Sequence, residues 1–492
     1  MITRRQLLIG SAAAGVAACA RTAIKTKLPL VTHGVQAGDV QTDRAFVWAR
    51  CDERARLMVE WSTGANFDKA TRVAGPLVGP DSDFTGMVPL TNLPPGQTIV
   101  YRLRFEREAS RGTSAWAYGR FATPRADHFR FVWTGDTCGQ GFGRNPEFGG
   151  LQGYAAMRRA EPAFFLHSGD LIYADNPILA EKQMPDGRIW KNITNPLVGK
   201  VAETLAEFRG RFAYNYEDEH VRALAAEVPI LAQWDDHETH NNWWPGQRLE
   251  DDRYLDPDAT KLAARALQAT REWTPIGGPS VHRVIHYGPL LDVFVVDLRT
   301  WRTPNDANRG DTGAMLGAAQ ARWLVDSVAA SRARWKVIAC DQPIALVIGD
   351  GPGDARQEGY ANGDGPPLGR ERELATVLAA MPDNVIWLTA DVHYAAAHHF
   401  DPARANGATF RPFWEFIAGP IHAGTFGPNT LDPTFGPELK FVWAPPTGTG
   451  NLAPWDGIQT FGAVDVSADA LHITLNGIDG KSRFAVDIPA IR

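Results

Sequence analysis

The chain of 492 residues has little cysteine, no block of basic residues and no apolar stretch long enough to cross a membrane. Its four cysteines are too few and too scattered for a disulfide framework. A formal net charge of −6, without any run of lysine and arginine, argues against a nucleic-acid-binding module. The apolar stretch 7–18 is shorter than the roughly 20 residues that a membrane-spanning helix needs. We also find no internal repeat and no low-complexity tract.

The first feature that is present is a targeting signal. Arg4 and Arg5 stand directly before the apolar stretch, a pattern typical of twin-arginine signals, which export proteins that have already folded. An ordinary secretory signal is the alternative. Cleavage after Ala20 and lipid modification of Cys19 both fit the sequence. We therefore set residues 1–20 apart from the fold and expect an exported protein, periplasmic or secreted, with or without a lipid anchor.

The remainder has the composition of a globular protein, with 44% hydrophobic and 22% charged residues, and is long enough for two or three domains. Residues 28–124 contain strand-like alternations at 45–49, 56–61 and 100–105, separated by turns rich in Gly, Pro and Asp. This spacing predicts a small all-β sandwich of the fibronectin type III kind. From residue 128 the pattern changes to alternating strands and helices, so we expect a second domain over 128–492.

The second domain opens with two short apolar runs that each lead into a Gly-Asp pair. Residues 129–133 are followed by Asp136, and residues 163–166 are followed by Asp170. The stretch 151–160 between them has helical character. A strand, a helix and a strand in this order predict a βαβ unit of a buried parallel sheet, whose ligand site lies beyond the carboxyl ends of the strands. The two aspartates should therefore lie side by side.

The same alternation continues through the chain. Further strands are expected at 229–234, 290–296, 335–339 and 384–389, and helices at 201–226, 258–274, 314–333 and 371–380. The polar connections 175–200 and 350–369 are long for a compact domain, which makes them candidate lids or substrate loops. Strands 461–466, 471–475 and 483–488 are expected to close a second sheet against the α/β core.

Four strand ends carry side chains that can bind metals. They are Asp136 with Cys138, Asp170 with Tyr173, Asp236 with its polar neighbours, and Asp391 with His393. Each alone has a structural explanation, because an aspartate after a strand is often a helix cap and a lone histidine is usually just hydrogen-bonded. We expect them to converge at one edge of one sheet, as a two-metal site requires. A thiolate and a phenolate together favour ferric iron over zinc or magnesium.

These motifs resemble the alkaline phosphatase D (PhoD-like) family of the calcineurin-like metallophosphoesterase superfamily. The resemblance is carried by GDTC at 135–138, SGDLIY at 168–173, WDDHETHNNW at 234–243 and ADVH at 390–393, with GVQAGD at 34–39 in the β-domain. It implies an α/β metallophosphoesterase-like core, with sheets flanked by helices, behind the small β-sandwich. It also implies an exported, metal-dependent phosphatase or phosphodiesterase that uses metal-activated hydroxide.

The resemblance also implies roles for individual residues. Ferric iron would be held by Asp136, Cys138, Asp170, Tyr173 and His393. Asp170 would bridge to a second cation, calcium or else manganese or zinc, which Asp236 or Asn241 would bind with Asp391. His237 would lie beside the scissile phosphate and, with Asp236, contribute to catalysis. Asp341 stands where the superfamily often has a metal-binding histidine, so it is either a ligand or a supporting residue.

Two other functions compete with this one. A glycoside hydrolase with Asp235 and Glu238 as its paired carboxylates would explain the many tryptophans, but would leave Cys138, Tyr173 and His393 without a role. An exported, non-catalytic binding protein with structural calcium would explain the β-domain and leave the α/β core unexplained. The sequence does not distinguish monoesters from diesters, and it does not give the natural substrate or the oligomeric state.

Overall fold

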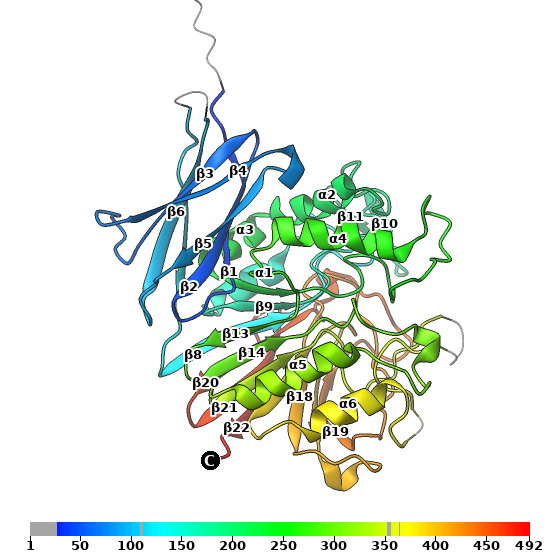
Figure 1. Ribbon diagram of the computed structural model, residues 1–492. Coiled ribbons are helices and arrows are strands. Elements are labelled where there is room, and N and C mark those ends of the chain that lie inside the picture. The colour runs from blue at the N-terminus through cyan, green and yellow to red at the C-terminus, as the bar shows by residue number, and fades with distance from the viewer. Residues whose placement is uncertain (1–26, 109–111, 352–355, 364) are drawn as a thin grey trace, which may run out of the picture.

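A computed structural model describes residues 27–108, 112–351, 356–363 and 365–492. The expected export signal at 1–20 lies outside these residues. The described chain forms a β-sandwich beside a larger body in which two sheets pack face to face (Figure 1). None of the described helices is long and apolar enough to cross a membrane.

The β-sandwich comprises the first seven strands, and the alternations predicted at 45–49, 56–61 and 100–105 correspond to three of them, β2, β3 and β6. One layer contains β1 (Val31–Gly38), β2 (Arg44–Cys51) and β5 (Thr85–Thr91), and the other contains β4 (Thr71–Val78), β3 (Ala55–Ser62), β6 (Thr98–Glu106) and β7 (Ala117–Ala122). Alternate residues of β6 are buried, among them Tyr101 and Leu103, because successive side chains of a strand point to opposite faces. The boundaries 28–124 and 128–492 remain predictions.

The β-sandwich shares hydrogen bonds with the core. β1 pairs in parallel with β12 (Ile230–Gln233), and the register joins Gly38 to Ile230. A side chain at Gly38 would collide with Pro275, whose ring carbon lies 2.5 Å from the position that a Cβ would take. The close approach of the two backbones therefore needs glycine here.

The first core sheet begins with the predicted βαβ unit. β8 (His128–Thr134) and β9 (Phe165–Ser168) pair in parallel, with Val132 opposite Phe165, and α1 (Gln152–Arg159) connects them. α1, α2 (Leu205–Tyr216), α3 (Glu219–Glu227) and α4 (Ala259–Trp273) pack on its outer face. The helix expected at 201–226 is two helices, because Asp218 accepts hydrogen bonds from the first amides of α3 and starts a new helix.

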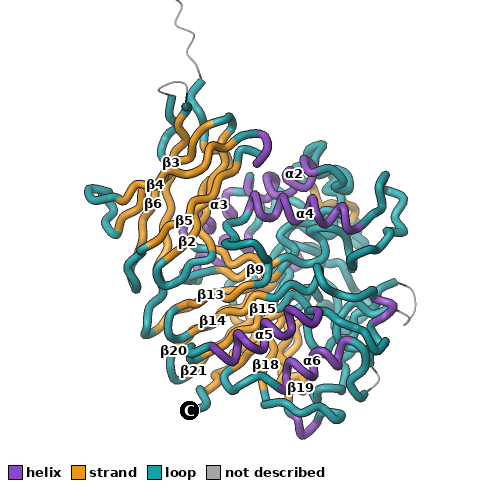
Figure 2. The backbone as a smooth tube through the Cα atoms, viewed as in Figure 1, coloured by secondary structure: helices purple, strands orange, loops and turns teal. Residues whose placement is uncertain are grey.

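The second core sheet lies behind the first. Its order is β13 (Arg283–Tyr287), β14 (Leu291–Val295), β15 (Trp335–Ala339), β16 (Val385–Thr389), β18 (Phe413–Ile417), β17 (Ala395–Phe400) and β19 (Pro437–Trp443). α5 (Gly317–Ala330) and α6 (Arg370–Ala379) cover its outer face (Figure 2). The inner faces of both sheets share one apolar core, in which Phe131 and Leu166 belong to the same cluster as Val293 and Leu388.

The last three strands differ from the prediction in their partner. β20 (Thr460–Ser467), β21 (Ala470–Gly477) and β22 (Ser482–Pro489) are strands as expected, but they extend the first sheet instead of closing the second. β20 pairs antiparallel with β8, with Val464 opposite Phe131. Gly462 permits this pairing, since a Cβ there would lie 2.0 Å from the ring of Trp133. An alternating pattern identifies a strand but not its neighbour.

The connection 175–200 also contains a short hairpin that the sequence does not predict, β10 (Glu181–Gln183) with β11 (Ile189–Lys191).

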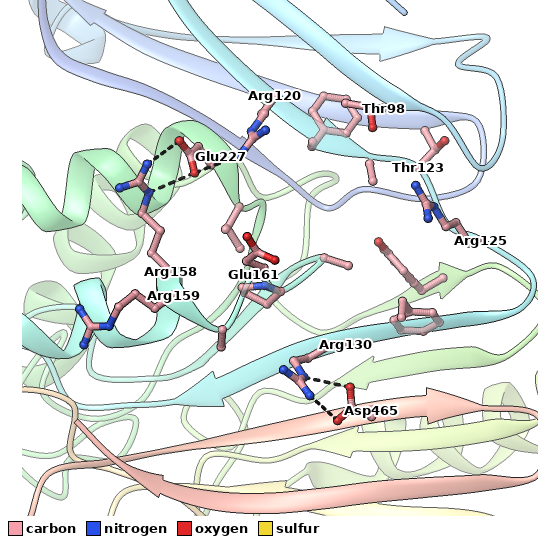
Figure 3. A pocket seen from close by; sticks show the side chains of 18 of the residues that line it. Thr98, Arg120, Thr123, Arg125, Arg130, Arg158, Arg159, Glu161, Glu227 and Asp465 are labelled. Atoms are coloured by element: carbon pink, nitrogen blue, oxygen red, sulfur yellow. Dashed lines mark hydrogen bonds and ion pairs between the residues drawn. The ribbon is translucent and has the colours of Figure 1, made fainter. Parts of the chain in front are cut away.

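A cavity of about 1150 Å³ separates the β-sandwich from the core on the side where β8 begins. Ion pairs line it, as Figure 3 shows: Arg120 of β7 reaches from the β-sandwich to Glu227 of α3, which also contacts Arg158 of α1, and Arg130 pairs with Asp465 on the core side. This cavity faces the amino-terminal end of β8, whereas ligand sites of such sheets lie at the carboxyl ends. The functional site must be sought at the other end.

Candidate metal centre

Metal-binding side chains gather where the strands of both sheets end. Asp136 follows β8, Asp170 follows β9 and Asp236 follows β12, all in the first sheet, whereas Asp391 and His393 follow β16 in the second. The expectation that these groups share one edge of one sheet is therefore wrong. Buried strands of either sheet have the same apolar sequence, so the pattern alone could not assign them.

The backbone turns sharply at these strand ends. Asp136, Asp170, Asp391 and His393 all have positive φ, at 70°, 52°, 64° and 63°. Non-glycine residues adopt this conformation at a cost of about 1–2 kcal/mol each, and such strain concentrates at functional sites.

The first group of donors combines Asp136, Asp170 and His393, whose ligand atoms lie within 4.8 Å of one another and are buried. The Tyr173 hydroxyl lies 3.1 Å from Asp136 Oδ1 and 2.8 Å from His393 Nε2. His393 Nδ1 donates to the carbonyl of Gly424, which can only accept, so Nε2 carries the lone pair. Carboxylate, imidazole and phenol therefore face one point.

Two further groups continue from the first. Asp170, Asp236 and His237 form one, and Asp235, Asp236 and Asp391 form the other, each within the same 4.8 Å limit. Asp170 belongs to the first two groups and Asp236 to the last two. A carboxylate shared between neighbouring groups is the arrangement by which two adjacent cations are bridged.

Cys138 is not brought together with these donors. Its side chain is 2% exposed and packs in the apolar cluster beneath α1, and burial raises the pKa of its thiol well above the usual range. No cysteine belongs to the metal-binding groups of the described residues. Closeness in sequence does not fix the direction of a side chain where the backbone turns away from a strand, and Cys138 also has positive φ.

His237 lies between the donor groups and a partner that the sequence did not reveal. Its Nδ1 is 2.7 Å from Asp175 Oδ1, its backbone amide donates to Asp170 Oδ1, and its ring stacks on Tyr173 with centroids 4.2 Å apart. Burial alone lowers the pKa of His237, but the charges of Asp175 and then Asp236 raise the net pKa to about 10. Asn241 donates its backbone amide to Asp175, and its side chain stays exposed beside Asp236 in the cleft.

A completely buried cation, Arg299, stands behind these acids. Its Nε lies 2.6 Å from Asp235 Oδ1, and its Nη1 lies 2.6 Å from Glu358 Oε1. Its Nη2 is 3.8 Å from Asp236 Oδ1 and 3.9 Å from Asp391 Oδ1, beyond hydrogen-bond distance. Arg299 thus compensates the inner carboxylates and leaves those of Asp236 and Asp391 available. The only signal in the sequence was its place two residues after Asp297, at the end of a strand.

Two other acids at the strand ends have structural partners. Asp341 accepts a hydrogen bond from Gln233, and its other oxygen lies 3.9 Å from Arg299, which makes it a supporting residue behind the donor groups. Glu238 accepts from the backbone amides of Asp235 and Leu171. Neither Asp235 nor Glu238 lines the cleft, so this pair cannot act on a glycoside there.

A cleft of about 740 Å³ opens over the centre. Its floor includes Asp236, His237, Asp391 and His393. The connection after residue 350, a candidate lid, reaches this floor through Glu358. A substrate can therefore reach the second and third donor groups directly from solvent.

Two packed sheets with outer helices and acidic and imidazole groups at their carboxyl ends define a metallophosphoesterase-like hydrolase. The chain belongs to the PhoD-like phosphatase family: the family model matches residues 131–475, and the model of the PhoD-like phosphatase N-terminal domain matches residues 17–125. Both matches confirm the resemblance read from the motifs. The chain is thus a phosphoric ester hydrolase. This assignment excludes the two alternatives, a glycoside hydrolase and a non-catalytic binding protein.

Individual relatives agree with this assignment. Alkaline phosphatase D of Bacillus subtilis (strain 168) is 26% identical over 430 residues, covering 80% of this chain and 70% of the relative. The solved structure of PhoD matches with a TM-score of 0.68 at 18% identity, over 93% of this chain and 89% of that one. Purple acid phosphatase PPD1 from yellow lupin (Lupinus luteus) seeds matches with a TM-score of 0.57 at 13% identity, over 94% and 74%. The two structures support the predicted fold class.

Proposed function

We propose that the centre hydrolyses phosphate esters with two bound cations, ferric iron in the first donor group and calcium in an adjoining site formed by Asp170, Asp236 and Asp391. The observation that carries this proposal is that Asp170 is shared between the first and second donor groups. Manganese or zinc in place of calcium would satisfy the same oxygen and nitrogen donors.

The buried donors fit such cations. Asp136 Oδ2 and Asp236 Oδ1 are buried oxygens without a hydrogen-bond partner, a costly state unless a cation completes them. Asp136, Asp170, Tyr173 and His393 would hold iron, to which a phenolate is well suited. Asp236 and Asp391, with Asn241, would hold the second cation. Cys138 is left out of the proposed set because its thiol packs in the apolar cluster.

When bound, such cations lower the pKa of a coordinated water and offset negative charge on the phosphoryl oxygens. The protein itself supplies the proton donor. Asp175 fixes Nδ1 of His237 and favours its charged form, so that Nε2 can donate to the leaving oxygen or to the phosphoryl group. Tyr173 packs against the imidazole and limits its rotation. His237 is thereby a proposed catalytic residue and Asp175 a positioning residue.

Metal analysis combined with a visible spectrum tests the proposal. We expect iron with a second metal in the purified protein, hydrolysis of para-nitrophenyl phosphate or bis(para-nitrophenyl) phosphate, and a visible band that Tyr173→Phe removes. Tyr154→Phe is the control, because the hydroxyl of this other buried tyrosine contacts Thr137, whereas that of Tyr173 contacts Asp136 and His393. A colourless, metal-free protein that hydrolyses both esters would overturn the two-cation assignment.

We also propose that the protein is exported by the twin-arginine route, on the basis of Arg4 and Arg5 before the apolar stretch. Cell fractionation of the full chain tests this: the protein should reach the periplasm or medium, and replacement of both arginines by lysine should retain it in the cytoplasm. Mass spectrometry of the mature N-terminus would separate a lipid-modified Cys19 from cleavage after Ala20. Unchanged export of the lysine variant would contradict the route.

A further inference from the structure

Apart from its histidines, the described lining of the cleft over the metal centre carries little positive charge for a site that binds phosphate esters. Among the described residues that line it, Arg253 is the only arginine and there is no lysine. Arg253 is itself occupied, because Asp251 binds its Nε and Nη2 and the carbonyl of Asp175 accepts from its Nη1. No free guanidinium or ammonium in this lining is left to bind additional phosphate or carboxylate groups of a substrate.

The outer wall of the cleft carries negative charge instead. Glu250, Asp251 and Asp252 are consecutive and all line the cleft. Asp251 is neutralised by Arg253 and also contacts His240, at 3.4 Å. Glu250 and Asp252 are exposed, and no ion pair of either is found among the described residues. Two uncompensated carboxylates therefore remain at the mouth.

These two carboxylates differ from the acids of the floor. Asp236 and Asp391 lie in the donor groups, where the proposed cations would offset their charge, and the unpartnered buried oxygen of Asp236 points to a ligand there. Glu250 and Asp252 belong to no such group of the described residues. A substrate group that extends from the phosphate along this part of the lining would meet Glu250 and Asp252.

Apolar and aromatic residues also line the cleft. Ile348 and Val392 line it together with Phe426, whose ring is half-buried and packs on His393. Aromatic faces and carboxylates together form a favourable environment for ammonium and quaternary ammonium groups. Neither the acidic nor the apolar residues of the lining favour a second anionic group.

We propose that this cleft selects phosphate esters whose organic arm carries a positive charge and disfavours esters with additional negative charges. The proposal rests on the proposed hydrolysis of phosphate esters at the same centre. Glu250 and Asp252 are the specificity-determining residues, acting through long-range attraction on the arm. For charges several ångströms apart in a solvent-exposed cleft, each carboxylate should change kcat/KM by about two- to threefold.

Three diesters with the same leaving group test this. They are para-nitrophenyl phosphocholine, its uncharged isostere para-nitrophenyl 3,3-dimethylbutyl phosphate, and para-nitrophenyl 2-carboxyethyl phosphate. We expect kcat/KM of the metal-loaded protein to fall in that order. In the Glu250→Gln/Asp252→Asn double variant, the ratio of the first two values should fall by about four- to tenfold. About 1 M salt should reduce the ratio in the unaltered protein, because screening acts over a few ångströms at that ionic strength.

Asp326→Asn provides the control for the loss of a carboxylate elsewhere, since Asp326 is exposed on α5 and does not line the cleft. In this variant, the ratio of kcat/KM for the choline ester to that for the dimethylbutyl ester should equal the ratio in the unaltered protein. Equal kcat/KM for the choline and dimethylbutyl esters, or an unchanged ratio in the double variant, would overturn this inference alone. A metal-loaded protein inert to all three diesters and to para-nitrophenyl phosphate would overturn the proposed function, and this inference with it.

Discussion

Arg299 is an arginine with 0% of its side chain exposed, and it contacts Asp235 and Glu358 at 2.6 Å. Removing one partner of a buried ion pair typically costs about 3–5 kcal/mol, because the remaining charges lose their compensation. We expect Arg299→Met to lower the free energy of unfolding by about that amount in urea titrations. Adding Glu358→Gln to this variant should recover part of the loss.

Arg248→Met is the control for this change. Arg248 is exposed, and its substitution should alter the free energy of unfolding by less than about 0.5 kcal/mol. If Arg299→Met were as stable as the control, Arg299 would not compensate the buried acids.

Asp175 is expected to affect catalysis through its hydrogen bond to His237. Asp175→Asn removes the charge that favours the protonated imidazole, so kcat should fall about 10- to 100-fold while KM changes little, as expected for a lost proton donor. Steady-state kinetics with para-nitrophenyl esters measure both constants. Asp251→Asn is the comparison, since Asp251 lines the same cleft but contacts His240 instead. Equal losses of kcat in both variants would argue against a specific role for Asp175.

The burial of His422 should make the free energy of unfolding depend on pH. It is 1% exposed, and burial lowers its pKa to about 4, although its hydrogen bond to Gly143 acts in the opposite direction. The neutral form is favoured in the folded protein, so its contribution is complete above the unfolded pKa of about 6.5 and is lost as pH falls towards 4. The free energy of unfolding should decrease across this window, by up to about 1.4 kcal/mol per pH unit from this histidine.

Denaturant titrations between pH 7 and pH 4 would measure this slope. His422→Gln should reduce the slope without abolishing it, because burial also lowers the pKa of His33 and His167 to about 4. An unchanged slope in His422→Gln would show that His422 does not contribute.

Among the elements, β20 depends on one glycine. A Cβ at Gly462 would lie 2.0 Å from the ring of Trp133, which is completely buried. We expect Gly462→Ala to lower the free energy of unfolding by about 1–3 kcal/mol, the usual cost of overpacking a core. Hydrogen exchange should rise first in β20–β22. Gly349→Ala is the control, because nothing lies within 4 Å of the added carbon.

The sequence predicted individual strands better than it predicted how those strands pair. The alternations at 461–466, 471–475 and 483–488 correctly predicted β20, β21 and β22, but not that β20 pairs with β8, since pairing depends on contacts between distant residues. For the same reason the strand ends carrying Asp136 and His393 were assigned to one sheet. No individual ranges were predicted for β1, β4, β5, β7, β10, β11, β13 or β17–β19. Arg299, Asp175 and Glu358 were missed because nothing local distinguishes a charged residue that will be buried.

The whole molecule is held together across the boundary between the β-sandwich and the core. Asp39, at the end of β1, pairs with Arg283 at 2.7 Å with both side chains largely buried, and Trp48 donates to the carbonyl of Glu272. Because one sheet also runs through both regions, we expect a single cooperative transition in calorimetry. Asp39→Ala should lower the transition temperature and broaden or split the transition. Two separate transitions in the unaltered protein would contradict this coupling.

The first donor group takes Asp136 and Asp170 from one sheet and His393 from the other. A cation bound there would cross-link the two sheets. Movement of one sheet relative to the other would then weaken its coordination. Metal occupancy and folding are then linked by mass action, so each tenfold rise in free metal above its dissociation constant should add about 1.4 kcal/mol to the free energy of unfolding. Chelation should therefore lower the melting temperature of the metal-loaded protein.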